Sequence, residues 1–281
     1  MRLEDLTPVP GVRHRTVAAN GVNLHVAEAG DGPPLLLVHG WPQHWWIWRH
    51  VIPTLAERYR VLAPDLRGHG WSDAPPGDYA KATFAADLLA LLDAEGIERT
   101  CIISHDWGGY ASFLLMLDHP ERVEKMLALD IPPPWPSPPH PGMALLPFAL
   151  IYQLPIVAPF LGPWLMRSGR FVPRLLAFGA GPDKRWTPEE VRAYTEVLRE
   201  PARARASVQI YRTFERREIA ESFRRARPSG LPVLLAMGAA SIFHRIIGDT
   251  GLRTELVPRC GHFIAEEKPD EVLRLAEAYF A

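Results

Sequence analysis

The chain has 281 residues, of which 47% are hydrophobic and 22% charged, so it can bury a large core in one domain or in one domain with an insertion. Its formal net charge of −1 gives no long-range attraction for polyanions, and a nucleic acid is therefore not expected as a partner. Two cysteines, Cys101 and Cys260, are too few for a disulfide framework and are interpreted as free thiols. The first residues, MRLEDLTPVPG, lack the apolar stretch of a signal peptide, so we expect a cytoplasmic protein.

The first predicted elements are two antiparallel strands, residues 15–19 and 22–29. They flank Asn20 and Gly21, a dipeptide that suits the positive φ angles of a tight hairpin turn. Short apolar runs follow, which are typical of strands buried on both faces of a parallel sheet. These runs cover residues 34–40, 60–65, 99–104, 125–130, 231–238 and 252–258.

Helices are predicted between these strands. In residues 79–96 four apolar residues recur at helical spacing, and Gly96 is a candidate C-terminal cap. The four are Phe84, Leu88, Leu91 and Leu92. A second helix is expected before residue 125, and a last one over residues 270–280. This alternation predicts an α/β fold with a doubly wound, mostly parallel sheet.

The alternation stops between residues 132 and 228, where apolar and then arginine-rich helical segments follow each other without a strand. Seven prolines between residues 132 and 141 make a stiff connection, and the strands before and after the interruption belong to one sheet. We therefore predict that residues 1–131 and 229–281 form the core and that residues 132–228 form an inserted helical cap. The arginines of the cap are interpreted as a solvated helical face in preference to an anion site.

One segment of the predicted cap, residues 143–166, has no charged side chain and is about as long as a helix that spans a bilayer. Its prolines would each remove a helical hydrogen bond and kink the segment. They are Pro147, Pro155, Pro159 and Pro163. We therefore expect broken helices covered by protein, and we do not expect a membrane as a partner.

The sequence Ser104-His105-Asp106-Trp107-Gly108 follows a predicted strand and precedes a helical segment. Small residues two positions before and after the apex are typical of a nucleophile elbow, a strained turn that pushes its apical side chain out over the sheet. Asp106 occupies the apex, where many hydrolases carry serine. Asp106 could also act as a helix N-cap, but we favour a nucleophile. Ser104 is two residues early and is expected to face the helix packing.

A carboxylate at the apex attacks an electrophilic carbon and forms an alkyl-enzyme ester, which an activated water must then hydrolyse. His262 follows the last predicted strand and suits the base, because a neutral imidazole accepts a proton near pH 7. Asp130, at the tip of the strand 125–130, is the predicted orienting acid. The loop after the strand 231–238 is the commonest place for this acid, but it offers only Ser241 at the expected position, and Asp249 remains the alternative.

The oxyanion formed during ester hydrolysis needs two backbone N–H donors. Trp107, directly after the apex, and Trp41, after the first parallel strand, are predicted to supply them. In the motif HGWP at residues 39–42, Gly40 allows close approach, and Pro42 fixes the turn, with a cis peptide as one option. His39 is interpreted as structural.

Five motifs resemble those of the α/β-hydrolase family and occur in the same order. They are HGWP, APDLRGHGWSD, HDWGG, DHPERV and CGHF. Within that family the chain is most similar to the epoxide hydrolases and to their haloalkane and haloacetate dehalogenase relatives. The resemblance covers the core on both sides of the cap and implies an α/β-hydrolase fold. An acid at the strand end occupied by Asp130 also has precedent among these relatives.

The resemblance also implies a role for tyrosines of the cap, which in epoxide hydrolases protonate the epoxide oxygen as the ring opens. Tyr211, in QIYRTFE, resembles the second of these tyrosines. Phe148 stands at the position of the first and cannot donate a proton. Tyr152, one helical turn further on, is the expected substitute.

The rival chemistry is dehalogenation, in which the indole N–H groups of Trp41 and Trp107 would stabilise a departing halide. Haloacetate enzymes carry arginines at the positions of Trp107 and Tyr110, so the resemblance disfavours a charged haloacid here. Nine tryptophans and the uncharged segment of the cap indicate an apolar cleft.

We therefore expect an enzyme, a hydrolase that converts small apolar epoxides to vicinal diols through an ester of Asp106, with no metal and no cofactor. Three alternatives stay open: a dehalogenase, a relative that binds a ligand without catalysis, and a hydrolase of esters or carbon–carbon bonds. The sequence does not indicate an oligomeric state.

Overall fold

The structure is a computed structural model that describes residues 1–281 apart from the side chain of Ala149. Eight strands form one sheet in the order β1-β2-β4-β3-β5-β6-β7-β8. The strands are β1 (Arg13–Ala19), β2 (Val22–Ala29), β3 (Pro34–Val38), β4 (Arg60–Pro64), β5 (Thr100–His105), β6 (Val123–Leu129), β7 (Val233–Gly238) and β8 (Arg253–Val257). β2 pairs antiparallel with β1 and β4, and all other pairs are parallel. The predicted mostly parallel sheet is confirmed.

The expected hairpin opens the sheet. Asn20 and Gly21 connect β1 to β2 with φ angles of 48° and 75°, which is the left-handed conformation that a two-residue hairpin turn requires. The central strands are buried on both faces, as their apolar runs predict. β3 and β4, for example, have buried residues at every position after the first.

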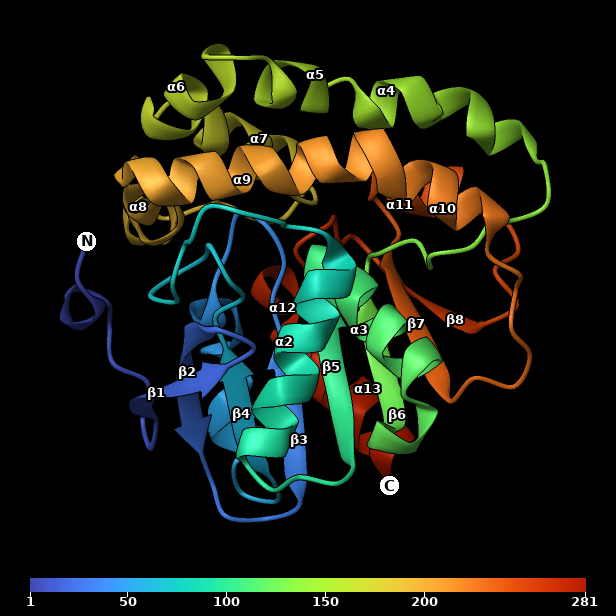
Figure 1. Cartoon of the computed structure of the whole chain (residues 1–281). Coiled ribbons are helices and arrows are strands. Elements are labelled where there is room, and N and C mark those ends of the chain that lie inside the picture. Colours follow the sequence, from blue (N-terminus) through green and yellow to red (C-terminus); the bar gives the residue numbers. More distant parts are fainter.

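Helices cover both faces of the sheet (Figure 1). α2 (Lys81–Ala94) and α3 (Asp106–Asp118) pack together on one face, and α13 (Pro269–Phe280) packs against β6 from the other. The four apolar residues predicted for α2 are each at most 1% exposed, and Gly96 follows the helix end with a φ of 63°. Shorter helices of the core are η1 (Leu3–Asp5), η2 (Trp45–Trp48), α1 (Ile52–Leu55), η3 (Pro120–Arg122), α11 (Ile242–Ile246) and α12 (Ile264–Glu267).

The segment 132–228 contains helices and, in the described part of the chain, no strand. These helices lie over the end of the sheet at which the parallel strands finish (Figure 1). They are η4 (Pro141–Leu145), α4 (Leu146–Leu150), α5 (Gln153–Val157), α6 (Leu161–Arg167), α7 (Phe171–Gly179), α8 (Pro188–Glu196), η5 (Val197–Arg199), α9 (Pro201–Thr213), the π-helical turn η6 (Phe214–Glu218) and α10 (Ile219–Arg224). We call this segment the cap, and the division of the chain into core and cap is a proposal.

The prolines divide residues 143–166 as expected, because this segment forms η4, α4, α5 and α6 in place of one continuous helix. In the described chain, no helix combines the length and apolar character needed to cross a bilayer.

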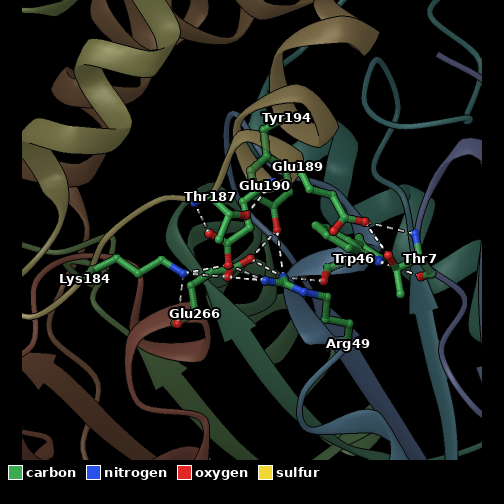
Figure 2. Close-up of polar contacts among 9 residues, drawn as sticks. All are labelled: Thr7, Trp46, Arg49, Lys184, Thr187, Glu189, Glu190, Tyr194 and Glu266. Atoms are coloured by element: carbon green, nitrogen blue, oxygen red, sulfur yellow. Dashed lines mark hydrogen bonds and ion pairs between the residues drawn. The ribbon is translucent and has the colours of Figure 1, made fainter.

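A buried ionic network joins the cap to the core (Figure 2). Arg49, which follows η2, donates to Glu190 of α8 at 2.7 Å and to Glu266 of α12 at 2.5 and 2.8 Å. Lys184 donates to Glu190 at 2.8 Å and lies 3.3 Å from Glu266, which also accepts a hydrogen bond from the hydroxyl of Tyr194. Two cations therefore balance two carboxylates in a buried region. Removal of any one of the four would leave a buried charge without its full complement of partners.

We predict that Arg49→Met lowers the free energy of unfolding by about 3–5 kcal/mol, because Glu190 and Glu266 would keep only Lys184 as a cation in a buried site. Urea unfolding at neutral pH measures this loss. Arg253→Met is the matched control, since Arg253 pairs with Glu255 at the surface and its loss is expected to cost less than about 1 kcal/mol. Equal losses in the two variants would contradict the prediction.

Candidate active site

The elbow forms where β5 ends at His105 and α3 begins at Asp106. Asp106 has a φ of 50°, so the apex adopts the strained left-handed conformation. A Cβ on Gly40 would lie 2.3 Å from the Cβ of Asp106, and a Cβ on Gly108 would lie 2.1 Å from the carbonyl oxygen of His39. The glycines around the apex are therefore required by the close approach of β3 and its loop to the elbow.

The carboxylate of Asp106 is held by a backbone donor. The N–H of Trp41 donates to Oδ1 at 2.9 Å, and the backbone of Trp107 helps to lower the pKa of the carboxylate. Of the two amides predicted for an oxyanion hole, that of Trp41 is thus hydrogen-bonded to Asp106, and that of Trp107 is adjacent to it in the chain. The Trp41–Pro42 peptide is cis, and His39 is buried with Nδ1 against the carbonyl of Gly40 and Nε2 accepting the N–H of Leu66, as a structural histidine would be.

His262 lies between two carboxylates. Its Nδ1 donates to Oδ2 of Asp130 at 2.7 Å, and its Nε2 lies 3.5 Å from Oδ2 of Asp106. Asp249, the alternative acid, is on the surface with Arg227 at 3.2 Å. The structure therefore brings Asp106, His262 and Asp130 together and leaves Asp249 apart from them.

Asp130 is fixed by two further donors. It follows β6 with a φ of 45°, and it accepts the N–H of Gly238 at 3.0 Å and the hydroxyl of Ser241 at 2.6 Å. Ser241 stands where the acid is most often found, and here it supports a carboxylate that comes from the neighbouring strand. Three donors on one buried carboxylate fix its orientation toward His262.

The charges of this cluster favour an ion pair. Burial alone would lower the pKa of His262, but its hydrogen bonds to Asp106 and Asp130 and their negative charges outweigh burial and raise this pKa to about 10. Burial also acts to raise the pKa of Asp106, yet the hydrogen bond and charge of His262 hold it below the ordinary value. Near neutral pH the apex is therefore an ionised carboxylate facing an imidazolium.

The two candidate tyrosines lie above the elbow. Tyr211 of α9 is buried, and its ring lies 5.2 Å from that of Trp41 and 5.7 Å from that of Trp107. Tyr152, just before α5, has its ring 6.0 Å from that of Tyr211, whereas Phe148 is 64% exposed. Burial raises the pKa of both tyrosines, so both hydroxyls stay protonated at neutral pH.

A cavity of about 180 Å³ opens beside Asp106. Apolar side chains form most of its wall, and among them are Trp107, Ile131, Trp135, Leu146, Leu150 and Phe214. A second cavity of about 290 Å³ is lined by His262, and Tyr152 and Phe243 contact both cavities. The elbow is thus reached from an apolar space that a small uncharged molecule fits.

Comparison with known proteins agrees with the fold. Residues 33–152 match a family model described as the alpha/beta hydrolase fold. The chain is 31% identical to a soluble epoxide hydrolase of Corynebacterium over 96% of this chain and 98% of that protein. It is also 31% identical to the AB hydrolase superfamily protein YfhM of Bacillus subtilis over the same shares of the two chains. The structure of the epoxide hydrolase CorEH superposes with a TM-score of 0.82 at 30% identity, over 96% of this chain and 98% of that one.

The chain belongs to the α/β-hydrolase family. Within this family it falls in the epoxide hydrolase-like group, and it is an enzyme, a hydrolase of that type.

Two residues of this α/β hydrolase were missed in the sequence. Nε2 of His105 donates to the carbonyl oxygen of His262 at 2.9 Å and so fixes the backbone of the histidine loop. Burial and the charge of His262 lower the pKa of His105 to about 3, so the ring stays neutral. Lys81 is fully buried, and its Nζ lies 2.6 Å from Glu218 of the cap and 4.3 Å from the ring centre of Trp107. His105 could have been identified in the sequence from its position beside the apex, whereas Lys81 could not.

One group of side chains has the spacing of metal ligands, namely His50, Glu190 and Glu266. Both carboxylates in it already bind Arg49 and Lys184 (Figure 2). The positive charge that a metal ion would supply is therefore provided by side chains of the chain itself.

We predict a pKa near 10 for His262 in this α/β hydrolase, measured by NMR titration of its ring protons. Asp106→Asn should lower this pKa by about 1–3, because one of the two flanking negative charges is lost. Since the folded pKa is raised above 6.5, the protonated ring stabilises the fold below pH 6.5, and this stabilisation disappears as the pH rises through 10. Asp249→Asn should leave the titration unchanged. An unchanged titration in Asp106→Asn would show that Asp106 does not hold the proton.

Proposed function

We propose that the enzyme hydrolyses apolar epoxides to vicinal diols through a covalent ester of Asp106. The observation that carries this proposal is the arrangement of an ionised carboxylate at the elbow, a histidine with its orienting acid on one side, and two protonated tyrosines above. Asp106, His262 and Asp130 are the proposed catalytic residues, with Trp41 and Trp107 as the oxyanion hole. The apolar wall of the cavity favours apolar substrates.

In the first step, an oxygen of Asp106 attacks an epoxide carbon, and the bond from that carbon to the ring oxygen breaks. The electron pair goes to the ring oxygen, which takes a proton from Tyr211, with Tyr152 beside it. No base is needed, because Asp106 is already ionised. The amide of Trp41 holds the carboxylate in its attacking position.

Ester formation also prepares the second step. It removes the negative charge of Asp106, which is one of the two charges that keep the proton on His262. The pKa of His262 therefore falls, and the proton that it releases balances the one that Tyr211 gave up. The neutral ring can now take a proton from water, which attacks the ester carbonyl while the two amides stabilise the oxyanion. The protonated ring then returns that proton to the departing alkoxide, which frees the diol. Asp106 is left as a carboxylic acid and gives its proton to the neutral ring of His262, which restores the resting ion pair.

A dehalogenase is the second candidate, and one observation favours it. The Nε1 atoms of Trp41 and Trp107 are buried and, within the described chain, have no hydrogen-bond partner. Such donors beside the nucleophile can bind a departing halide. The two tyrosines and the similarity to epoxide hydrolases favour the epoxide reaction.

A single turnover in H₂¹⁸O tests the ester. We expect the label in the carboxylate of Asp106 and not in the diol, because water attacks the ester carbonyl and the diol carries away an oxygen of Asp106. Mass spectrometry of the peptide that contains residue 106 and of the product measures both. His262→Gln should accumulate the adduct of substrate mass on Asp106, whereas His119→Gln, at the opposite end of α3 from the elbow, should not. Label found entirely in the diol would exclude the covalent route.

The epoxide hydrolase and dehalogenase reactions differ in their leaving group, so measurement of the product released distinguishes them. We expect Tyr211→Phe to slow diol formation from styrene oxide by about 10²–10⁴-fold, since the ring oxygen loses its proton donor. Phe148→Tyr serves as a control with little effect, because that position is exposed. Diol and bromide are measured separately, with a bromoalkane as the second substrate. Rapid bromide release together with negligible turnover of the epoxide would favour the dehalogenase.

A further inference from the structure

Large apolar side chains are exposed on the outer helices of the cap. Nine large hydrophobic residues of the described chain are exposed, and six of them lie on or beside α4, α5 and α6. We call these six the outer cap face: Phe148, Ile151, Leu154, Phe160, Leu161 and Trp164. Figure 1 shows these three helices as the layer farthest from the sheet. Single exposed apolar residues are ordinary, whereas six large ones on three successive short helices indicate an interaction surface.

Phe160 is the most exposed member of the outer cap face. It is 93% exposed and has a φ of 59°, between α5 and α6. A bulky residue in the left-handed region carries backbone strain, which proteins retain mainly at functional positions. The ring gains almost no burial within the chain that would offset this strain. It is therefore available for contact with a molecule outside the chain.

Arginines border the same face. Arg167, Arg205 and Arg212 line a surface hollow of about 790 Å³ together with Phe160 and Trp164. Arg167 and Arg212 bond backbone carbonyl oxygens, and within the described chain none of the three guanidinium groups pairs with a carboxylate. The cap as a whole has 15 Lys and Arg against 8 Asp and Glu, a net charge of +7 in a chain whose total is −1.

We propose that the outer cap face docks on the surface of an anionic lipid bilayer. Phe160, Trp164 and their apolar neighbours would enter the boundary between headgroups and acyl chains, and the arginines of the hollow would meet lipid phosphates. The helices are too short to cross the bilayer, so the contact is peripheral. It differs from our expectation from the sequence that no membrane takes part. The prolines exclude a spanning helix but not a contact at the surface.

The charges favour lipid over a second copy of the chain. An interface related by a two-fold axis would bring together two faces that carry the same arginines and no carboxylate in the hollow. Like charges at such an interface are unfavourable, whereas anionic headgroups neutralise them. The outer cap face is therefore more complementary to an anionic lipid surface than to the same face of a second copy of the chain.

Docking here would place the bilayer close to the cavity. Leu146 and Leu150 line the cavity beside Asp106, and Phe148, from the same short helix α4, points outward. An apolar molecule dissolved in the bilayer would then be separated from the cavity by a single helix. This consequence for substrate entry rests on the proposed function, but the docking itself does not.

Flotation of the full chain with lipid vesicles tests the proposal. We expect binding to vesicles of phosphatidylcholine with phosphatidylglycerol, much weaker binding to phosphatidylcholine alone, and weakening with added salt. Phe160→Gly should lower the affinity by about tenfold or more through the loss of a buried ring. Its melting temperature should not fall, because glycine relieves the strain at this φ. Arg205→Gln should also weaken binding.

Two controls match these variants. Leu256→Ser changes an exposed apolar residue of β8, and Arg13→Gln changes an exposed arginine of β1, both remote from the cap. Neither should alter vesicle binding. The proposal is overturned if anionic vesicles bind no better than neutral ones, or if the cap variants bind as the controls do. It is also overturned if the chain sediments as a dimer that Phe160→Gly dissociates, because a second copy then covers the face.

Discussion

The site depends on one imidazole held between two carboxylates. His262 contacts Asp130 through one ring nitrogen and approaches Asp106 through the other, and the pair of negative charges keeps it protonated in spite of burial. The same interaction keeps Asp106 ionised, so in the resting site the proposed nucleophile is charged and the proposed base is already protonated. Loss of either carboxylate charge changes the state of the ring. The charges of these three side chains therefore explain why ester formation would precede activation of water in the proposed reaction.

The sheet brings these three residues together from distant parts of the chain. Asp106 follows β5, Asp130 follows β6, and His262 lies beyond β8, so 132 residues separate the histidine from the acid that it contacts. The order of the strands changes direction beside β3, and the loop after β3 supplies the amide of Trp41 next to the elbow. A crevice at such a switch point is where parallel α/β sheets place ligands. The buried network around Arg49 then holds the cap above it (Figure 2).

Much of this could be predicted from local signals in the sequence. The strands and the hairpin at Asn20 and Gly21 follow from apolar runs and turn residues, and the small residues around Asp106 predict the strained turn that its φ of 50° shows. The position of Asp130 at a strand end favoured it over Asp249, and only Asp130 lies beside His262. Tyr152 lies near Tyr211 as expected, while Phe148 faces outward. The contacts of His105, Lys81 and Arg49 could not be predicted, because each depends on segments whose approach has no local pattern.

The crowding at the elbow has a consequence for how this scaffold can change over evolutionary time. Gly40 is pressed against the Cβ of residue 106, an atom that every amino acid except glycine possesses, and Gly108 is pressed against a backbone carbonyl. Because the nearest of these contacts is made by a Cβ, glycine stays necessary at position 40 when another residue replaces Asp106. A substitution at the apex can therefore change the side chain while the backbone of the elbow is preserved, whereas a side chain at position 40 or 108 would displace that backbone.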